Sequence, residues 1–202
     1  MNIEILQNFI VFEGLDGAGT TTQSKKLSER LGGFHTFEPS DNIIGKMIRS
    51  ILKGDTDITK ETLVFLFAAD RNQHVSLIRK FLDEGKTVVC DRYLFSSLAY
   101  QSLDVDFEKV FELNKSFPLP EHLFFIDTPI EECQRRINHR NQTKEIFEGI
   151  ELQERILFNY NKSLKRYEDF GFKYHRLDGN LPVNILFEKE MEIIRDKSLI
   201  NK

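Results

Sequence analysis

Short apolar runs alternate with amphipathic segments along this chain. Runs of strand length predict five strands, at residues 9–13, 35–37, 87–90, 123–126 and 173–177. Between them, apolar residues recur at helical spacing, which predicts helices at residues 21–31, 43–52, 60–84, 94–102, 107–115, 129–140, 151–170 and 183–196. Strands that are apolar on both faces and alternate with helices are typical of an α/β fold, in which helices cover both faces of a parallel sheet.

Local start and stop signals support several of these boundaries. Thr59 precedes the longest helical pattern and is a good N-cap residue, and Pro129 suits the first turn of a helix. Pro118 and Pro120 are expected to break the preceding helical pattern. Residues 141–149 are polar and charged, and we expect them to form a mobile loop.

The composition narrows the class of protein. A chain of 202 residues that is 40% hydrophobic can bury one substantial core, so we expect a single domain over residues 1–202. A net charge of −4 argues against a broad nucleic-acid surface. The longest apolar run, at 63–69, is too short to span a membrane, and the N-terminus lacks the pattern of a signal peptide. Two cysteines without metal-ligand spacing suit a reducing compartment, so we expect a cytoplasmic protein.

Polar residues follow four of the predicted strands. A glycine-rich loop follows the first, Glu38 the second, Asp91 and Arg92 the third, and Asp127 the fourth. Ligands of parallel sheets bind outside the carboxyl ends of the strands. We therefore expect these residues to face one crevice.

The glycine-rich loop has the spacing of a phosphate-binding loop with one member missing. Gly14-x4-Gly19-x-Thr21 fits the pattern, but Thr20 stands where lysine is expected. Backbone amides at the start of a helix can hold the phosphates of a nucleotide without that lysine. A glycine-rich turn without a ligand is the alternative. The predicted nucleotide-phosphate site comprises Gly14, Leu15, Asp16, Gly17, Ala18, Gly19, Thr20, Thr21 and Thr22.

Two residues of the crevice have side chains suited to Mg²⁺. Thr21 has the hydroxyl that binds the metal in such loops, and Asp91 closes an apolar strand. Arg92 follows with a guanidinium group that matches phosphate. Alternatively, Asp91 only caps the next helix.

Three blocks together resemble the thymidylate kinase family. They are Phe-Ile-Val-Phe-Glu-Gly-Leu-Asp-Gly-Ala-Gly at 9–19, Leu-Phe-Ala-Ala-Asp-Arg at 66–71 and Asp-Arg-Tyr-Leu-Phe-Ser-Ser-Leu-Ala-Tyr-Gln at 91–101. The last is the most discriminating, since general phosphate-loop kinases lack it. The resemblance covers essentially the whole chain. It implies a P-loop kinase fold of about five parallel strands with a small mobile lid at about 136–150. It also implies Mg²⁺-assisted transfer of the γ-phosphoryl group of ATP to dTMP by a homodimer.

The resemblance also implies an acceptor site. Phe67 would stack on thymine, Arg71 would contact the base edge, and Tyr100 would favour a deoxyribose. Phe67 and Arg71 lie one helical turn apart, although a phenylalanine in a helix is often plain core. The full dTMP-binding set is Asp16, Glu38, Pro39, Arg49, Phe67, Arg71, Arg92, Ser96, Ser97, Tyr100 and Gln101.

The chain departs from the family pattern near the phosphates. It is similar to bacterial-type members, in which the lid supplies a catalytic arginine, but here Ile146 stands at that position. Thr20 and Phe37 also replace basic residues. The catalytic set implied by the resemblance is Asp16, Arg92, Arg140 and Lys144. Two alternatives stay open, namely another nucleoside or nucleotide kinase of the same fold, and a nucleotide-binding protein that has lost catalysis.

Overall fold

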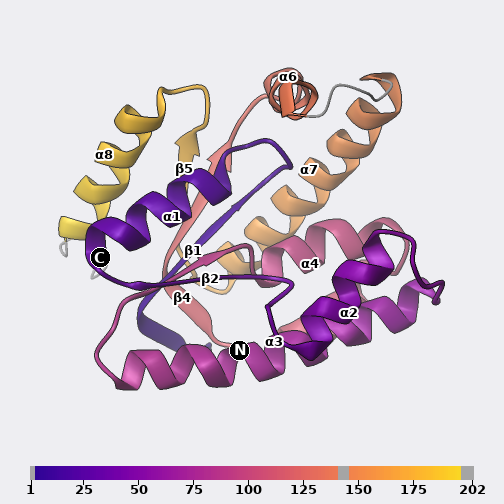
Figure 1. Ribbon diagram of the computed structural model, residues 1–202, viewed down its shortest axis with the longest axis horizontal. Coiled ribbons are helices and arrows are strands. Elements are labelled where there is room, and N and C mark those ends of the chain that lie inside the picture. The colour runs from indigo at the N-terminus through magenta and orange to yellow at the C-terminus, as the bar shows by residue number, and fades with distance from the viewer. Residues whose placement is uncertain (1–2, 141–145, 197–202) are drawn as a thin grey trace.

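A five-stranded parallel sheet forms the centre of the molecule (Figure 1). The computed structural model describes residues 3–140 and 146–196. The strands lie in the order β2-β3-β1-β4-β5. Their bounds are β1 (Ile5–Gly14), β2 (Phe34–Phe37), β3 (Val88–Asp91), β4 (Leu119–Asp127) and β5 (His175–Asp178). The predicted α/β class and the parallel sheet are thus confirmed.

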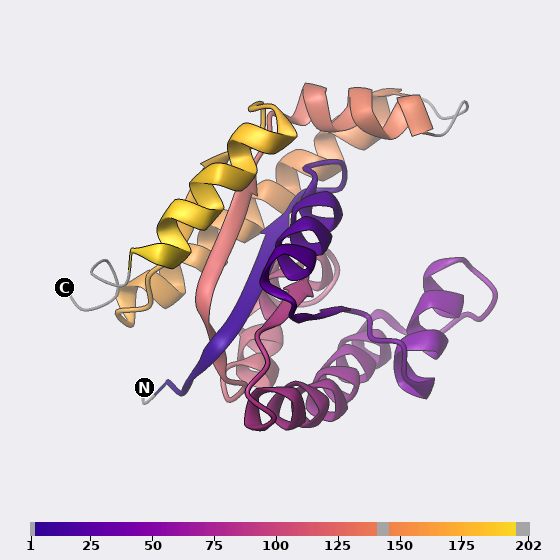
Figure 2. The same cartoon turned by 60° about the vertical axis from the view of Figure 1, so that its left-hand side comes forward.

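Helices cover both faces of the sheet (Figures 1 and 2). Helices α1 and α8 pack on one face, whereas α3, α4 and α7 pack on the other. Their bounds are α1 (Thr20–Leu31), α2 (Ile43–Leu52), α3 (Lys60–Asp83), α4 (Leu94–Tyr100), α5 (Phe107–Asn114), α6 (Ile130–Arg140), α7 (Ile146–Asp169) and α8 (Val183–Arg195). None of the helices in the described parts of the chain is both long and apolar enough to cross a bilayer.

The crevice for ligands lies at the carboxyl ends of the neighbouring strands β1 and β3. The helix that follows β1 lies on one face of the sheet, and the helix that follows β3 lies on the other. Adjacent strands whose connections leave in opposite directions open a crevice at their carboxyl ends. Strand β1 is held rigidly there, because Phe9, Val11 and Phe12 have no exposed surface.

Helix α5 ends at Asn114, before Pro118 and Pro120, as the prolines predicted. Pro120 itself lies in β4 beside Leu6 of β1, near the start of the strand, where a missing N–H is tolerated. Two predictions of local structure were wrong. The end of the predicted helix over 94–102 is a separate 3₁₀ turn at Gln101–Leu103. Helix α7 begins at Ile146, so residues 146–149 are helical rather than part of a loop. The rest of the expected loop, residues 141–145, lies outside the described residues.

Helix α2 packs closely on the turn that precedes it, and this contact depends on Gly45. A Cβ atom at Gly45 would lie 1.9 Å from the carbonyl oxygen of Ser40. We expect Gly45→Ala to destabilise the protein by about 2 kcal/mol, because the turn must move to relieve this overlap. Thermal unfolding should then show a melting temperature about 4–8 °C lower. Lys46→Ala, an exposed substitution on the same helix, is the control, and equal melting of the two variants would contradict the prediction.

Candidate functional site

The glycine-rich loop joins β1 to α1 and needs its glycines for two reasons. Gly17 and Gly19 have φ angles of 86° and 107°, and residues with a Cβ atom rarely adopt such positive values. A Cβ atom at Gly17 would also lie 2.5 Å from the carbonyl oxygen of Cys133 on α6. No side chain of the described residues caps α1 at Gly19. The first amides of α1 are therefore left for an anion, which is the chemistry expected of a phosphate loop.

Thr21, in the first turn of α1, and Asp91, at the end of β3, meet beside this loop. The Thr21 hydroxyl donates a hydrogen bond of 2.5 Å to Asp91 Oδ2. The other carboxylate oxygen, Oδ1, is buried and has no hydrogen-bond partner among the described residues. A buried carboxylate oxygen without a partner is costly, and a bound cation would relieve that cost.

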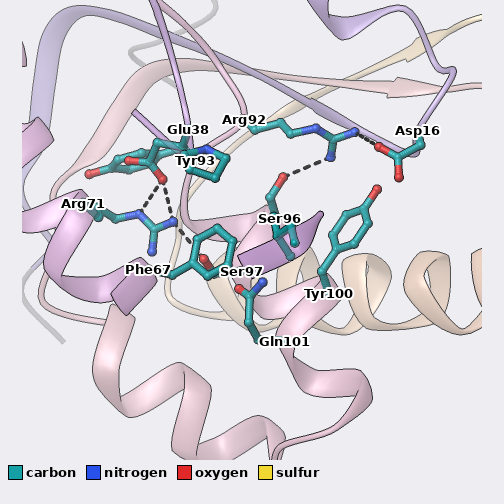
Figure 3. A pocket seen from close by; sticks show the side chains of 12 residues that line it. Asp16, Glu38, Phe67, Arg71, Arg92, Tyr93, Ser96, Ser97, Tyr100 and Gln101 are labelled. Atoms are coloured by element: carbon teal, nitrogen blue, oxygen red, sulfur yellow. Dashed lines mark hydrogen bonds and ion pairs between the residues drawn. The ribbon is translucent and has the colours of Figure 1, made fainter. Parts of the chain in front are cut away.

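Arg92 lies across the mouth of the loop. Its backbone has a φ angle of 70°, which is uncommon for a residue other than glycine and is typical of functional sites. One terminal nitrogen, Nη2, donates to Asp16 Oδ1 at 2.7 Å. The other, Nη1, donates to Ser96 Oγ at 3.2 Å (Figure 3). It also donates to Gly14 O and Tyr160 Oη. These contacts fix the guanidinium group at the edge of the crevice.

A cavity of about 330 Å³ opens beside Arg92 (Figure 3). Every residue expected to bind the acceptor lines it except Arg49, and Leu52 and Tyr93 line it in addition. Figure 3 shows Phe67, Tyr100 and Gln101 gathered around this space, with Arg92 and Asp16 at one end. The residues come from the loop after β1, the segments after β2 and β3, helices α2, α3 and α4, and the 3₁₀ turn that follows α4. The cavity therefore combines an aromatic ring, two arginines and several hydrogen-bonding groups.

Arg71 is fully buried at the base of this cavity. Its Nε and Nη2 atoms donate to Glu38 Oε2 at 3.0 and 2.6 Å, and Nη2 also donates to Ser97 Oγ. Burial raises the pKa of Glu38, but Arg71 and His74 lower it by more, so the carboxylate stays charged. His74 Nδ1 lies 3.0 Å from Glu38 Oε1. This set of contacts fixes the plane of the Arg71 guanidinium group.

Arg49 and Asp127 do not lie where the sequence suggested. Arg49 Nη1 donates to the carbonyl oxygens of Pro39 and Ser40, at 2.6 and 2.7 Å, and Arg49 is not among the lining residues of the cavity. It supports the turn that places Pro39 in the cavity. Asp127 pairs with Arg176 of β5 at 2.7 Å instead of facing the crevice.

A second cavity, of about 370 Å³, lies on the other side of the loop. It is lined by residues 17–19, by Arg136 of α6 and by residues 179–183, together with α8. Arg136 donates to Ala18 O at 3.1 Å and to Gly179 O at 2.8 Å, so it joins the loop to the segment after β5. A groove of about 260 Å³, lined by the loop together with Arg92 and Ile137, lies between Arg92 and the start of α1.

The remaining basic residues expected near the phosphates are only partly accounted for. Lys144 lies outside the described residues, and Arg140 is the last residue of α6, with a side chain that also lies outside them. Thr20, at the position of the expected lysine, is 4% exposed, and its methyl group packs against Gly14. Arg92 and Arg136 are thus the described basic side chains that flank the loop.

Sequence reasoning missed two residues at this site, Glu13 and Tyr160. Glu13 has no exposed surface, and Tyr160 reaches it from α7. A charged residue within an otherwise apolar strand was the available signal for Glu13. Tyr160 had none, because its contact depends on how α7 packs across the sheet.

Comparisons with known proteins agree with this geometry. Residues 12–189 match the sequence model of the thymidylate kinase family. A relative from Treponema pallidum that is named as a thymidylate kinase is 37% identical, over 96% of this chain and 98% of its own length. A relative from Methanocaldococcus jannaschii that is also named as a thymidylate kinase is 42% identical, over 81% of this chain and 84% of its own length. The solved thymidylate kinase structure from Candida albicans superposes with a TM-score of 0.78 at 21% identity, covering 96% of this chain and 93% of that one.

Proposed function

Because this chain belongs to the thymidylate kinase family, we propose that its two cavities hold dTMP and ATP on opposite sides of the glycine-rich loop. The protein is an enzyme that phosphorylates dTMP. We assign dTMP to the cavity at Phe67, since it has an aromatic ring for the base and Arg92 for the phosphate. This cavity is the observation that carries the proposal.

The donor nucleotide is assigned to the other side of the loop. The amides that begin α1 and the groove beside Arg92 suit the phosphates of ATP. The second cavity, at Arg136 and residues 179–183, is then the site of the adenosine. In this arrangement Arg92 lies between the two substrates, in contact with Asp16. Transfer of the phosphoryl group would proceed mainly through positioning and charge stabilisation, to which a fixed guanidinium group contributes.

Mg²⁺ fits the residues at the start of α1 and the end of β3. Asp91 Oδ1 is buried without a partner in the described chain, and the Thr21 hydroxyl lies against the same carboxylate. Two protein ligands suffice, since Mg²⁺ keeps waters and substrate phosphates as its other ligands. When bound, the ion would neutralise charge on the β- and γ-phosphates. Asp91 and Thr21 would hold it.

The acceptor preference is the direct test of this function. Release of ADP by the purified protein would be measured with dTMP, dUMP, dCMP, dGMP and UMP as acceptors. We expect dTMP to give the highest kcat/KM. A different best acceptor would favour another kinase of the same fold, and no acceptor-dependent turnover would favour a binding protein without catalysis. The binding-protein alternative gains no support from the geometry, because Asp16, Asp91 and Arg92 are present and in contact with partners.

The threonine side chain at position 20 is expected to contribute little to the reaction. It is buried against Gly14, so Thr20→Ala should change kcat by less than about threefold. Thr20→Lys should raise kcat by about tenfold, because the longer side chain can follow the groove that Thr20 lines and add charge at the phosphates. Steady-state assays of both variants test this. A large loss in Thr20→Ala would show a role for the hydroxyl that the structure does not reveal.

We further propose a homodimer that packs through α2 and α3. Large apolar side chains are exposed there, with Ile43 at 83%, Met47 at 54% and Phe65 at 52%. Helix α2 lies beside the start of α3 and stands away from the sheet (Figure 2). The apolar face of α5 is buried within this chain and is not available. Sedimentation velocity would show a monomer if this proposal is wrong.

We also propose a cytoplasmic location, because both cysteines are free thiols. Cys90 and Cys133 are both free and buried, which suits a reducing compartment. Fractionation of cells that express the tagged protein would test this, and recovery outside the cytoplasm would contradict it.

A further inference from the structure

Glu13 is a buried carboxylate next to the site that lines none of the three cavities around the loop. Its Oε1 atom accepts the backbone N–H groups of Tyr93 and Ser96, at 2.9 and 3.1 Å. Its Oε2 atom accepts the hydroxyls of Ser96 and Tyr160, at 2.6 and 3.0 Å. Glu13 thereby ties the end of β1 to the start of α4 and to α7.

The same two hydroxyls also bind Arg92. Nη1 of Arg92 donates to Ser96 Oγ at 3.2 Å and to Tyr160 Oη at 3.1 Å. A hydroxyl has one proton, so a hydroxyl that donates to Glu13 presents only lone pairs to its other neighbours. Ionised Glu13 therefore orients the Ser96 hydroxyl as an acceptor toward Arg92. The Tyr160 hydroxyl can donate to Glu13 Oε2, at 3.0 Å, or to Gly14 O, at 3.1 Å, and either direction leaves its lone pairs for Arg92.

We infer that Glu13 positions Arg92 through the hydroxyls of Ser96 and Tyr160. None of the three is a catalytic residue in this inference, which rests on the proposed role of Arg92 at the phosphates. Tyr160 lies 68 residues from Arg92 along the chain and comes from α7. The network also fixes the unusual backbone of Arg92, because the N–H groups at the start of α4 are held by Glu13.

The ionisation of Glu13 gives this network a measurable signature. Burial raises the pKa of Glu13 to about 7, while Ser96, Arg92 and the backbone of Tyr93 oppose that rise. The charged and titratable groups that interact with Glu13 are Arg92, Arg71 of α3, Cys90 of β3 and Tyr160 of α7. The charged form of Glu13 is the one that orients the hydroxyls. Activity should therefore fall as the pH falls through about 7, because the protonated carboxyl no longer accepts both hydroxyl protons.

The first variant is Tyr160→Phe, which keeps the ring in place against Phe125 and Tyr100. Arg92 loses one acceptor and Glu13 loses one donor. We expect the KM for dTMP to rise about tenfold, with the KM for ATP unchanged. The acid limb of the kcat/KM profile should also move to higher pH, since a lost donor makes the charged form of Glu13 less favourable.

Tyr167→Phe is the matched control on the same helix. The Tyr167 hydroxyl is buried and has no hydrogen-bond partner among the described residues. Its removal should leave both KM values and the pH profile as in the wild type. Thermal melting of the wild type, Tyr160→Phe and Tyr167→Phe shows whether each protein folds.

The second variant is Glu13→Gln, whose amide nitrogen cannot accept a hydroxyl proton. We expect kcat/KM for dTMP at about pH 8 to fall about tenfold, to the value of the wild type at low pH. The acid limb of the kcat/KM profile near pH 7 should disappear. The phosphate of dTMP titrates near ~6, and this titration stays the same in every variant, so the comparison isolates Glu13.

Two results would overturn the inference. One is a folded Glu13→Gln variant that keeps the wild-type pH profile, and the other is a Tyr160→Phe variant that changes neither the KM for dTMP nor the acid limb. Failure of the proposed function looks different, because the wild-type protein would then show no preferred turnover of dTMP. Failure of the proposed role of Arg92 would instead leave Arg92→Ala active on dTMP. The positioning inference alone fails when Arg92→Ala is inactive while Tyr160→Phe and Glu13→Gln have the same KM for dTMP and the same pH profile as Tyr167→Phe.

Discussion

Arg92→Ala is expected to lower kcat/KM for dTMP by about 10³-fold. Arg92 is the described arginine that lines both the acceptor cavity and the groove at the start of α1. Its guanidinium group is held in place by Asp16 and three further oxygen atoms, so it needs little rearrangement to meet a phosphate. Alanine removes this group without filling either cavity.

Steady-state kinetics with dTMP and ATP varied separately would measure the effect. Arg92→Lys should recover only part of the loss, because an ammonium group keeps the charge but not the two-nitrogen fork. Arg79→Ala is the control, since Arg79 forms an exposed ion pair with Glu4 away from the site. Activity of Arg92→Ala within tenfold of the wild type would remove Arg92 from the proposed mechanism.

Asp91→Ala is expected to lower kcat by about 10²-fold or more. Asp91 has a buried carboxylate oxygen without a partner in the described chain, and its other oxygen contacts Thr21. Loss of the carboxylate leaves Thr21 as the only proposed protein ligand for Mg²⁺. Folding should not suffer, since removal of a poorly compensated buried charge relieves a desolvation cost.

The dependence of rate on Mg²⁺ separates this role from helix capping, the alternative for Asp91. We expect the concentration of Mg²⁺ for half-maximal rate to rise in Asp91→Asn, which keeps the shape and removes the charge. Asp127→Asn is the matched control, because Asp127 also ends a strand but pairs with Arg176 of β5. An unchanged Mg²⁺ requirement in Asp91→Asn would contradict the metal assignment.

Several features of the site were predictable because they depend on local sequence. The strand, glycine loop and helix at residues 9–31 are encoded by an apolar run, three glycines and a helical pattern, and the structure has the same elements with small shifts at their ends. Thr59 caps α3 as expected, with its hydroxyl accepting the N–H of Thr62. Parallel strands align their carboxyl ends, so polar residues after β1, β2 and β3 were expected to meet.

Other features were not predictable, because they depend on packing between distant segments. Arg49 was expected to bind dTMP, but its nearest acceptors are carbonyl oxygens of the turn at Pro39 and Ser40. The fourth strand was expected to begin at Leu123, but it begins at Leu119, because the early part of β1 pairs with Leu119 and Pro120. The position of α7, which brings Tyr160 to Arg92, follows from its packing against α4 and has no local signal.

The sequence by itself determined the family, the order of elements and the residue types that gather at the crevice. These depend on period, spacing and composition, which are properties of short segments. The tertiary structure decided how those residues are used. Burial of Glu13 and the crossing of α7 place two hydroxyls between Glu13 and Arg92. Hydrogen bonding and desolvation depend on neighbours in space, so only the folded arrangement shows that Arg92 is held by a buried carboxylate that lies outside the cavities.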